Sequence, residues 1–265
     1  KYWAGLNSYE PVVLENLEEE LNSVQDSLLH ATLVENSITL IQNKKDIFPI
    51  KEVSDIKIGY VKLGDAPHAD FLQMLNKYTS VTEVKLDASS NFFQELKDFD
   101  KIIIGYHKSN SNPWKSYQFQ KEELELLKTI SSTNDVLLSV FASPYSLLDI
   151  SYFVDIEGVL VGYQNSAITQ ETAAQMIFGA LETKGRLPVS IGTHFKEGFG
   201  LNSLNLMRLS YTLPERVGLS SKKLQRIDSI VKVVIAEKMT PGAQIIVARK
   251  GVVVYQKSFG YMTYE

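Results

Sequence analysis

Residues 158–191 read GVLVGYQNSAITQETAAQMIFGALETKGRLPVSI, and this stretch decides the fold. It opens with a short apolar run, residues 158–163, whose length and β-branched content predict a strand buried on both faces of a sheet. A polar turn follows. From Thr169 the apolar residues recur at helical spacing, with Thr169 as the expected N-cap and Gly185 just past the expected end of the helix. The stretch predicts a strand, a turn and a covering helix.

The same alternation extends toward the N-terminus. Short apolar runs predict further strands at residues 56–61, 81–86, 101–106 and 136–142, and helical patterns lie near residues 68–78, 92–97, 120–131 and 145–150. Repeated strand–helix units with right-handed crossovers build a parallel sheet with helices on both faces. The sequence therefore predicts an α/β domain with a flavodoxin-like strand order.

Different patterns flank this region. Two helices are expected between residues 12 and 41, the second starting at the N-cap Ser23 and carrying Ile38 and Ile41 on its apolar face. Residues from 217 onward predict a helix followed by a hairpin at 243–248 and 252–256, which would have little core of its own. We expect a helical lead-in at 1–45, an α/β domain at 46–191, a linker at 192–216 and a helix–hairpin fragment at 217–265.

Composition removes several classes of function. The net charge is −4 and Lys and Arg cluster no further than pairs, which argues against a nucleic-acid partner. The chain has no cysteine, so thiol catalysis, disulfides and thiolate metal sites are excluded. No apolar run approaches the ~20 residues of a membrane span. The chain starts without Met and without a signal-peptide pattern, so we expect a piece of a longer protein whose targeting signals lie upstream.

Loops at the carboxyl ends of parallel strands concentrate function, and here they are expected at residues 62–67, 107–119, 143–144 and 164–167. The second, HKSNSNPWKSYQF, is long and combines aromatic, amide and hydroxyl groups, which suit the apolar face and hydroxyl rim of a sugar ring. A loop that packs on a neighbouring domain would use the same residues, and both interpretations stay open. The candidate substrate-binding or domain-facing residues are His107, Asn110, Asn112, Trp114, Tyr145 and Asn165.

The residues that nucleotide binding, metal binding, serine-nucleophile catalysis and glycoside hydrolysis need are missing or misplaced in this sequence. The first strand-to-helix turn, residues 60–67, holds one glycine, which does not favour a nucleotide site. The four histidines are scattered singly, so no metal site is predicted, and no cofactor is expected. Two Ser-x-x-Lys sequences begin at Ser54 and Ser220, but the first precedes a strand and the second is a helix cap. The strand-end loops offer only Asp65 and Asp149, so the pair of carboxyl groups that glycoside hydrolysis needs is missing.

Several segments resemble the second domain of glycoside hydrolase family 3. The sequence GRLPVSI at residues 185–191 is similar to the segment that closes that domain, and the Tyr163-Gln164-Asn165 turn with Ala174-Gln175 resembles its β-N-acetylglucosaminidase branch. Four further segments add to the resemblance, which covers about the first three quarters of the chain: residues 1–6, 35–43 with 48–50, 111–115 and 143–147.

This resemblance implies a non-catalytic domain of a larger hydrolase. In the family, a TIM-like barrel carries the Asp nucleophile, and in this branch also the His-Asp pair that supplies the proton. Neither motif is in this sequence, and the absence of Glu from the expected strand-end loops argues against the glucosidase arrangement, in which the second domain supplies the acid. The implied partners are the catalytic barrel and an N-acetylglucosaminide, and the implied location is periplasmic or extracellular.

The tail from residue 217 to 264 is similar to the opening of serine β-lactamase-like domains, on Pro241-Gly242-Ala243, Arg249-Lys250-Gly251 and Ser258-Phe259-Gly260-Tyr261. The likeness stops before the expected nucleophile motif. Two alternatives of other classes remain: a carbohydrate-binding or scaffolding module of a cell-envelope protein, and a flavodoxin-like nucleotide binder.

Overall fold

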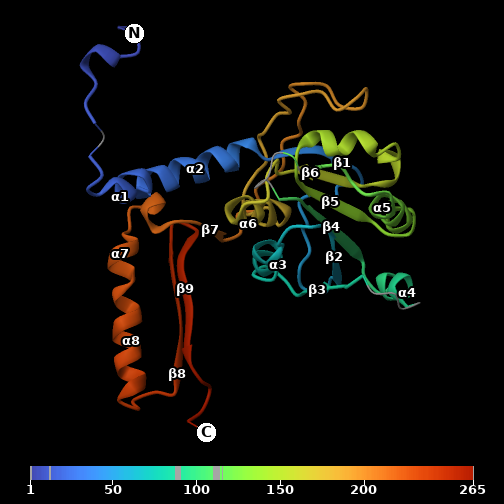
Figure 1. The fold of residues 1–265 in the computed structure, drawn as a ribbon. Helices are drawn as coiled ribbons and strands as arrows, with labels where there is room; N and C mark the ends of the chain where they lie inside the picture. Colours follow the sequence, from blue (N-terminus) through green and yellow to red (C-terminus); the bar gives the residue numbers. More distant parts are fainter. Residues whose placement is uncertain (1, 12, 87–90, 110–113, 115, 265) are drawn as a thin grey trace.

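The structure is a computed structural model of the chain and describes residues 2–11, 13–86, 91–109, 114 and 116–264. Three parts follow one another: an extended N-terminal segment, an α/β domain, and a C-terminal helix with a long hairpin (Figure 1). The described residues contain no helix that is both long enough and apolar enough to cross a membrane.

A six-stranded sheet forms the centre of the α/β domain, in the order β1-β6-β5-β4-β2-β3. Strands β2 to β6 are parallel, and β1 joins β6 antiparallel at the edge. Counted along the chain, the five parallel strands lie in the order 2-1-3-4-5, which confirms the flavodoxin-like arrangement. The strands are β1 (Thr39–Asn43), β2 (Ile58–Gly64), β3 (Val81–Glu83), β4 (Lys101–His107), β5 (Val136–Phe141) and β6 (Gly158–Val161).

Helices cover both faces of this sheet, as predicted, and each face has its own apolar core. On one face the core is built with α2 (Val24–Ser37), α3 (Ala69–Leu75) and α6 (Ala167–Ile177). On the other it is built with α4 (Phe92–Leu96), α5 (Lys121–Thr133) and two short 3₁₀ helices, η2 (Pro144–Asp149) and η3 (Phe153–Asp155). Every residue of β5 is buried, which explains why this strand is a continuous apolar run.

The ends of α6 differ from the prediction. Ser166, not Thr169, is the N-cap, because its hydroxyl accepts the backbone N–H of Thr169 at 3.3 Å. The helix ends at Ile177, and Gly179, with φ of +66°, turns the chain away. Gly185 instead packs against the end of α2, where a Cβ would lie 2.3 Å from the carbonyl oxygen of Ser37, so only glycine fits there.

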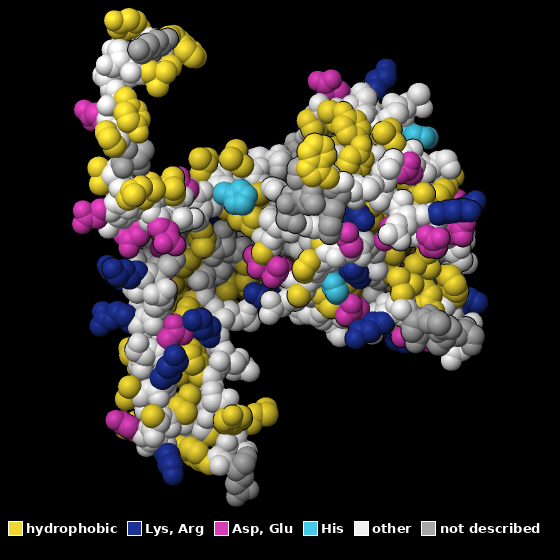
Figure 2. All heavy atoms as spheres, viewed as in Figure 1, with side chains coloured by type: hydrophobic (Ala, Val, Ile, Leu, Met, Phe, Trp, Pro, Cys, Tyr) yellow, Lys and Arg dark blue, Asp and Glu magenta, His cyan; other side chains and the backbone are white. Residues whose placement is uncertain are grey.

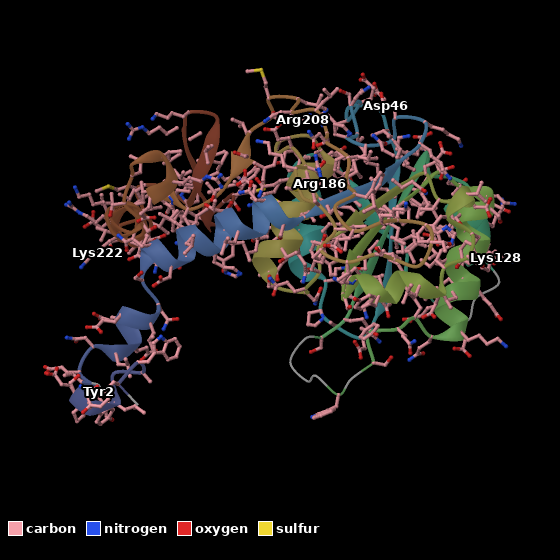
Figure 3. The ribbon with its side chains drawn as sticks, turned by 90° about the horizontal axis from the view of Figure 1, so that it is seen from above. Tyr2, Asp46, Lys128, Arg186, Arg208 and Lys222 are labelled. Carbon is pink, nitrogen blue, oxygen red and sulfur yellow. The ribbon has the colours of Figure 1, made fainter. Side chains whose placement is uncertain are left out.

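The N-terminal prediction was wrong in one respect. Helix α2 ends at Ser37, so Ile38 and Ile41 are buried in an extended segment and in β1 rather than on a helix. Antiparallel pairing of Thr39 with Val161 in β6 holds this segment extended. Before α2 only η1 (Leu6–Ser8) and α1 (Leu17–Leu21) are helical among the described residues, and Tyr2 lies far from the rest of the protein (Figure 3).

The predicted C-terminal hairpin is confirmed. It pairs β8 (Gly242–Arg249) with β9 (Val252–Gly260), and Lys250 and Gly251 both have positive φ, as a two-residue primed turn requires. Short β7 (Ser210–Tyr211) adds to β9, while η4 (Pro214–Val217), α7 (Ser221–Leu224) and α8 (Arg226–Ala236) precede the hairpin. Apolar side chains remain exposed on this unit (Figure 2): Ile230, Val233, Met239 and Ile246.

Specific contacts tie the C-terminal unit to the α/β domain. Arg208, which lies in the irregular segment before β7 (Figure 3), donates from Nη1 to the carbonyls of Ile50 and Phe178, both at 2.7 Å. The buried amide of Gln175 accepts the Tyr211 N–H at 2.7 Å and donates to the Tyr211 carbonyl at 3.1 Å. A side chain of α6 thus pairs with β7 as a neighbouring backbone would.

Candidate functional site

The strand order of the main sheet reverses between β2 and β4. In open α/β sheets, ligands bind outside the carboxyl ends of the strands at this point. Tyr60 lies within β2 and His107 ends β4, so both belong to this region. Asn165 follows β6 and completes the set of groups that meet here.

A buried hydrogen-bond network joins these residues. His107, which has no exposed surface, bonds through Nδ1 to Asn165 Oδ1 at 2.7 Å and through Nε2 to the Tyr60 hydroxyl at 2.9 Å. Asn165 donates from Nδ2 to the Pro67 carbonyl at 2.8 Å. Gln170 adds a bond from Nε2 to Asn165 Oδ1 at 3.1 Å. The network therefore links β2, β4, the loop before α3 and the turn before α6.

The network fixes where the protons lie. The Pro67 carbonyl can only accept, so the Asn165 amide must turn its Nδ2 toward Pro67 and its Oδ1 toward His107. His107 then carries its proton on Nδ1, and Nε2 accepts from the Tyr60 hydroxyl. Burial lowers the pKa of His107 to about 3, against the opposing effect of the Asn165 hydrogen bond, and burial raises the pKa of Tyr60. Both groups are neutral near pH 7.

Aromatic rings fill the point where the strand order reverses. His107 stacks on Phe141 with centroids 4.6 Å apart, and Phe71 lies edge-on to both at 5.8 and 5.0 Å. The adjoining turn is equally tight, because a Cβ on Gly64 would lie 2.0 Å from the His107 carbonyl oxygen. These rings fill the space between the ends of β4 and β5 and helix α3. The single glycine of the turn after β2 does not favour a nucleotide site there.

Two glutamates near this edge are engaged in contacts within the protein. Glu83, at the end of β3, lies 2.9 Å from Nε2 of His68. Glu123, on α5, accepts the backbone N–H of Gly64 and that of Gln120, both at 2.8 Å. Within the described part of the chain, no group of three or more His, Asp and Glu side chains could hold a metal ion. These carboxylates therefore stabilise the loops.

The long loop after β4 is anchored where it returns to the sheet. Tyr106 donates from its hydroxyl to the Tyr117 carbonyl at 2.9 Å, and its ring stacks on Phe119 with centroids 3.7 Å apart. Trp114 is 91% exposed. Of the candidates on this loop, Asn110 and Asn112 lie outside the described residues.

The six predicted site residues thus differ in position. The structure brings His107 and Asn165 into direct contact; His107 is fully buried and Asn165 is half-buried. Tyr145, on η2 after β5, is 40% exposed and belongs to the same edge of the sheet as Trp114. The hydrogen-bond network holds the loop before α3 and the turn before α6 to β2 and β4, whereas Trp114 and Tyr145 are exposed.

Sequence reasoning did not identify Tyr60, His68 and Gln170 as members of this region. Tyr60 lies inside an apolar strand and gives no signal of its polar contact. Gln170 does give one, because it is a buried amide on the side of α6 that packs against α3, where its Oε1 accepts the Phe71 N–H at 3.1 Å. A polar residue on a buried helix face indicates a specific partner.

Comparison with known proteins shows similarity in structure alone. No protein-family model and no curated protein sequence matches the chain. Among solved structures, a fungal multi-domain GH3 β-N-acetylglucosaminidase is similar over 69% of this chain, with 21% identity and a TM-score of 0.53. The β-glucoside phosphorylase BglX is similar over 71%, with 18% identity and a TM-score of 0.57. A β-glucosidase from Erythrobacter marinus is similar over 70%, with 14% identity and a TM-score of 0.53.

These similarities establish a shared fold. This chain spans 20% of the fungal protein and 36% of each of the other two. The shared α/β unit is therefore a minor part of each of those longer chains.

Proposed function

We propose that this chain is a non-catalytic α/β domain of a glycoside hydrolase, which packs on a catalytic barrel and helps to shape its sugar site. The observation that carries the proposal is the fold shared with three enzymes of sugar chemistry, each of which has most of its chain outside the shared part. Fold alone does not give function. The resemblance of residues 163–165 and 185–191 to the β-N-acetylglucosaminidase branch of family 3 supports the same assignment.

The carboxylates near the strand ends fit this role. Glycoside hydrolysis needs an acid and a nucleophile or base facing a common space. Glu83 and Glu123 instead hold His68 and the turn at Gly64. We assign the exposed aromatic side chains Trp114 and Tyr145 to the surface that faces a partner. Such groups suit either a sugar or an apolar domain interface.

The test has two parts. The isolated chain is incubated with a chromogenic N-acetyl-β-glucosaminide, and release of the chromophore at an enzymatic rate would contradict the proposal. In the full-length enzyme that the proposal implies, Trp114→Ala and Tyr145→Ala should each lower kcat/KM by about tenfold, the loss expected from about 1.4 kcal/mol of lost contacts. Tyr261→Ala is the matched control, since Tyr261 is 83% exposed on the C-terminal unit.

A carbohydrate-binding module is the second candidate, favoured by the exposure of Trp114. Under that function, Trp114→Ala would weaken binding to a polymeric sugar and leave turnover unchanged. The same pair of measurements therefore separates the two functions.

The C-terminal unit is proposed as the start of a β-lactamase-like domain. In support, α8 packs along the β8–β9 hairpin and leaves apolar side chains uncovered. If a longer version of the chain is covalently acylated by a fluorescent penicillin, the assignment is supported. A longer version that folds but is not acylated would contradict it.

A further inference from the structure

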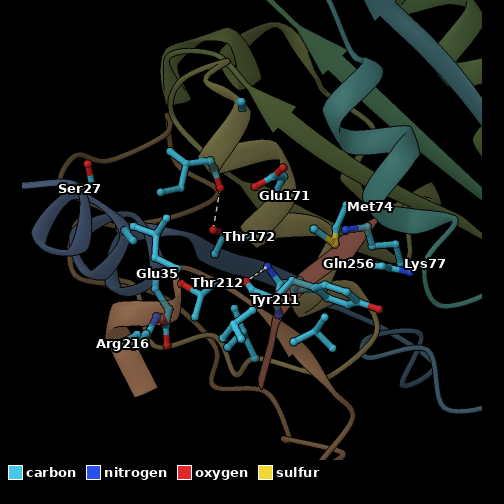
Figure 4. Close-up of a pocket in the computed structure, with 18 of the residues that line it drawn as sticks. Ser27, Glu35, Met74, Lys77, Glu171, Thr172, Tyr211, Thr212, Arg216 and Gln256 are labelled. Carbon is cyan, nitrogen blue, oxygen red and sulfur yellow. Dashed lines mark hydrogen bonds and ion pairs between the residues drawn. The ribbon is translucent and has the colours of Figure 1, made fainter. Parts of the chain in front are cut away.

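A cavity of about 530 Å³ lies between the α/β domain and the C-terminal unit (Figure 4). Its walls come from α2, from α3 and α6, and from β7 and β9. Its volume falls within the range of small-molecule sites. None of the residues assigned above to the sugar-facing surface lines it, so a role for this cavity is independent of the proposed function.

Part of the lining is apolar and rigid. Met74 and Val253 are each 3% exposed, and Leu181 and Ile168 add aliphatic surface. Two polar contacts of the lining join the two parts of the protein. Arg216 pairs with Glu35 at 2.5 Å, and Gln175 makes two hydrogen bonds to Tyr211. These groups shape the cavity and hold the two parts of the protein together.

Two other charged side chains in the lining, Glu171 and Lys77, do not form ion pairs that join the two parts of the protein. Glu171 is half-buried on α6, and its carboxylate makes no hydrogen bond or ion pair with a described residue. Lys77, just after α3, holds its ammonium group 4.3 Å from the centroid of the Tyr211 ring and makes no ion pair with a described residue. Figure 4 shows Glu171, Met74 and Lys77 along the same wall, and α3 and α6 are in close contact. The two charges attract each other without touching.

Partial burial makes both charges unfavourable as they stand. Burial, together with the charge of Asp70, raises the pKa of Glu171, and burial lowers the pKa of Lys77. A ligand that gave Glu171 a cation and Lys77 an anion would offset both desolvation costs. A ligand with a single charge would pair with either Glu171 or Lys77 and would displace water from the other side chain.

We propose that this cavity binds a small zwitterion, with its ammonium group on Glu171, its carboxylate on Lys77 and its carbon chain against Met74. Tyr211 fixes the Lys77 ammonium through the cation–π contact, so the positive group is in place before the ligand arrives. The ligand class is that of amino acids whose two charged groups match the spacing of Glu171 and Lys77.

The experiment uses the whole chain and titration calorimetry near pH 7 with glycine, 4-aminobutanoate and 6-aminohexanoate. These probes carry the same two groups at increasing separation. Butylamine and butanoate carry one group each. We expect one amino acid to bind at least about tenfold more tightly than either single-charge probe. Equal binding of butylamine, or no binding of any amino acid, would overturn the proposal.

Variants locate the site. Glu171→Gln and Lys77→Met should each lower the affinity for that amino acid by about tenfold or more. Glu122→Gln and Lys128→Met are matched controls on α5, and Lys128 also lies over a tyrosine ring, that of Tyr152, at 6.0 Å. The controls should bind as the parent chain does. Thermal unfolding checks that each variant folds, and a folded Glu171→Gln protein with unchanged affinity would refute the assignment.

Discussion

His107 is neutral in the folded protein because its surroundings stabilise the neutral imidazole and not the charged imidazolium. The Asn165 oxygen accepts a hydrogen bond from Nδ1–H, the Tyr60 hydroxyl donates to Nε2, and the imidazole has no exposed surface. A charged imidazole here would be desolvated without a counter-ion. The network therefore makes the protein's stability depend on pH in a known direction.

Lowering the pH from 7 to 5 should reduce the free energy of unfolding by about 2 kcal/mol through this residue alone. The pKa of His107 falls from its ordinary 6.5 to about 3 on folding, so between these values the unfolded chain binds a proton that the folded chain does not. The stabilisation is complete above pH 6.5 and is lost as the pH falls toward 3. Urea unfolding at the two pH values measures it.

Two comparisons isolate His107 in that measurement. His107→Gln should lose this part of the pH dependence, whereas His30→Gln, at an exposed position on α2, should keep it. The imidazole can also be followed directly by NMR, where its resonances should stay constant from about pH 7.5 to about 4.5. A His107 midpoint near its ordinary 6.5 in the folded protein would show that the proton is not excluded.

At the scale of single residues, the sequence named His107 and Asn165 as candidates for a substrate- or domain-facing surface but did not indicate that they contact each other. They are 58 positions apart, and their contact depends on the parallel register of β4, β5 and β6. Spacing along the chain carries no such information. Trp114 and Tyr145 were selected for their chemistry alone; both are exposed, and their role stays a prediction.

At the scale of elements, the sheet was predictable because buried parallel strands are short apolar runs. The ends of α6 were not, because Ser166 and Thr169 are both good caps and Gly179 and Gly185 both good terminators. Strand β1 was missed because its partner, β6, lies far along the chain, as the pairing of Thr39 with Val161 shows. The pairing of β1 with β6 therefore determines the structure of a segment that the local sequence pattern does not specify.

The segment at Gly200 and Leu201 covers the outer edge of β1, and Gly185 and Gly200 make this possible. Leu201 donates its N–H to the Leu40 carbonyl at 2.7 Å, which pairs the edge. A Cβ on Gly185 would lie 2.3 Å from the Ser37 carbonyl oxygen, and one on Gly200 would lie 2.3 Å from the Gly185 carbonyl oxygen. Backbone has to move before any larger residue fits.

Gly185→Ala should therefore lower the free energy of unfolding by about 3 kcal/mol or more, at the upper end of the overpacking range. Gly198→Ala is the control, because a Cβ there meets nothing within 4 Å and only the positive φ of 78° is strained, at a cost of about 1 kcal/mol. Chemical denaturation of both variants gives the comparison. Equal losses would show that the segment adapts and that close approach is not the reason for glycine at 185.

At the scale of the whole molecule, the α/β domain buries its strands more completely than the C-terminal unit does. The central strands lie between two helical layers, and β4 and β5 are buried almost throughout. In the C-terminal unit, α8 covers one face of a sheet of three strands, and α8 has a single buried residue, Val231. The two regions touch through polar contacts, such as those of Arg208 and Gln175, and through the packing of Tyr211 on Tyr78.

We therefore expect hydrogen exchange to separate them. Amides of α8, β8 and β9 should exchange at least about tenfold faster than those of β4 and β5, because opening a single layer exposes little apolar surface. Mass spectrometry of peptides after timed labelling near pH 7 measures both regions in one sample. Gln175→Ala should speed exchange in β7 and β9 and leave β4 unchanged, since it removes the side chain that pairs with Tyr211. Equal protection of the two sheets, and equal response to this variant, would instead mean that the protein opens as one cooperative unit.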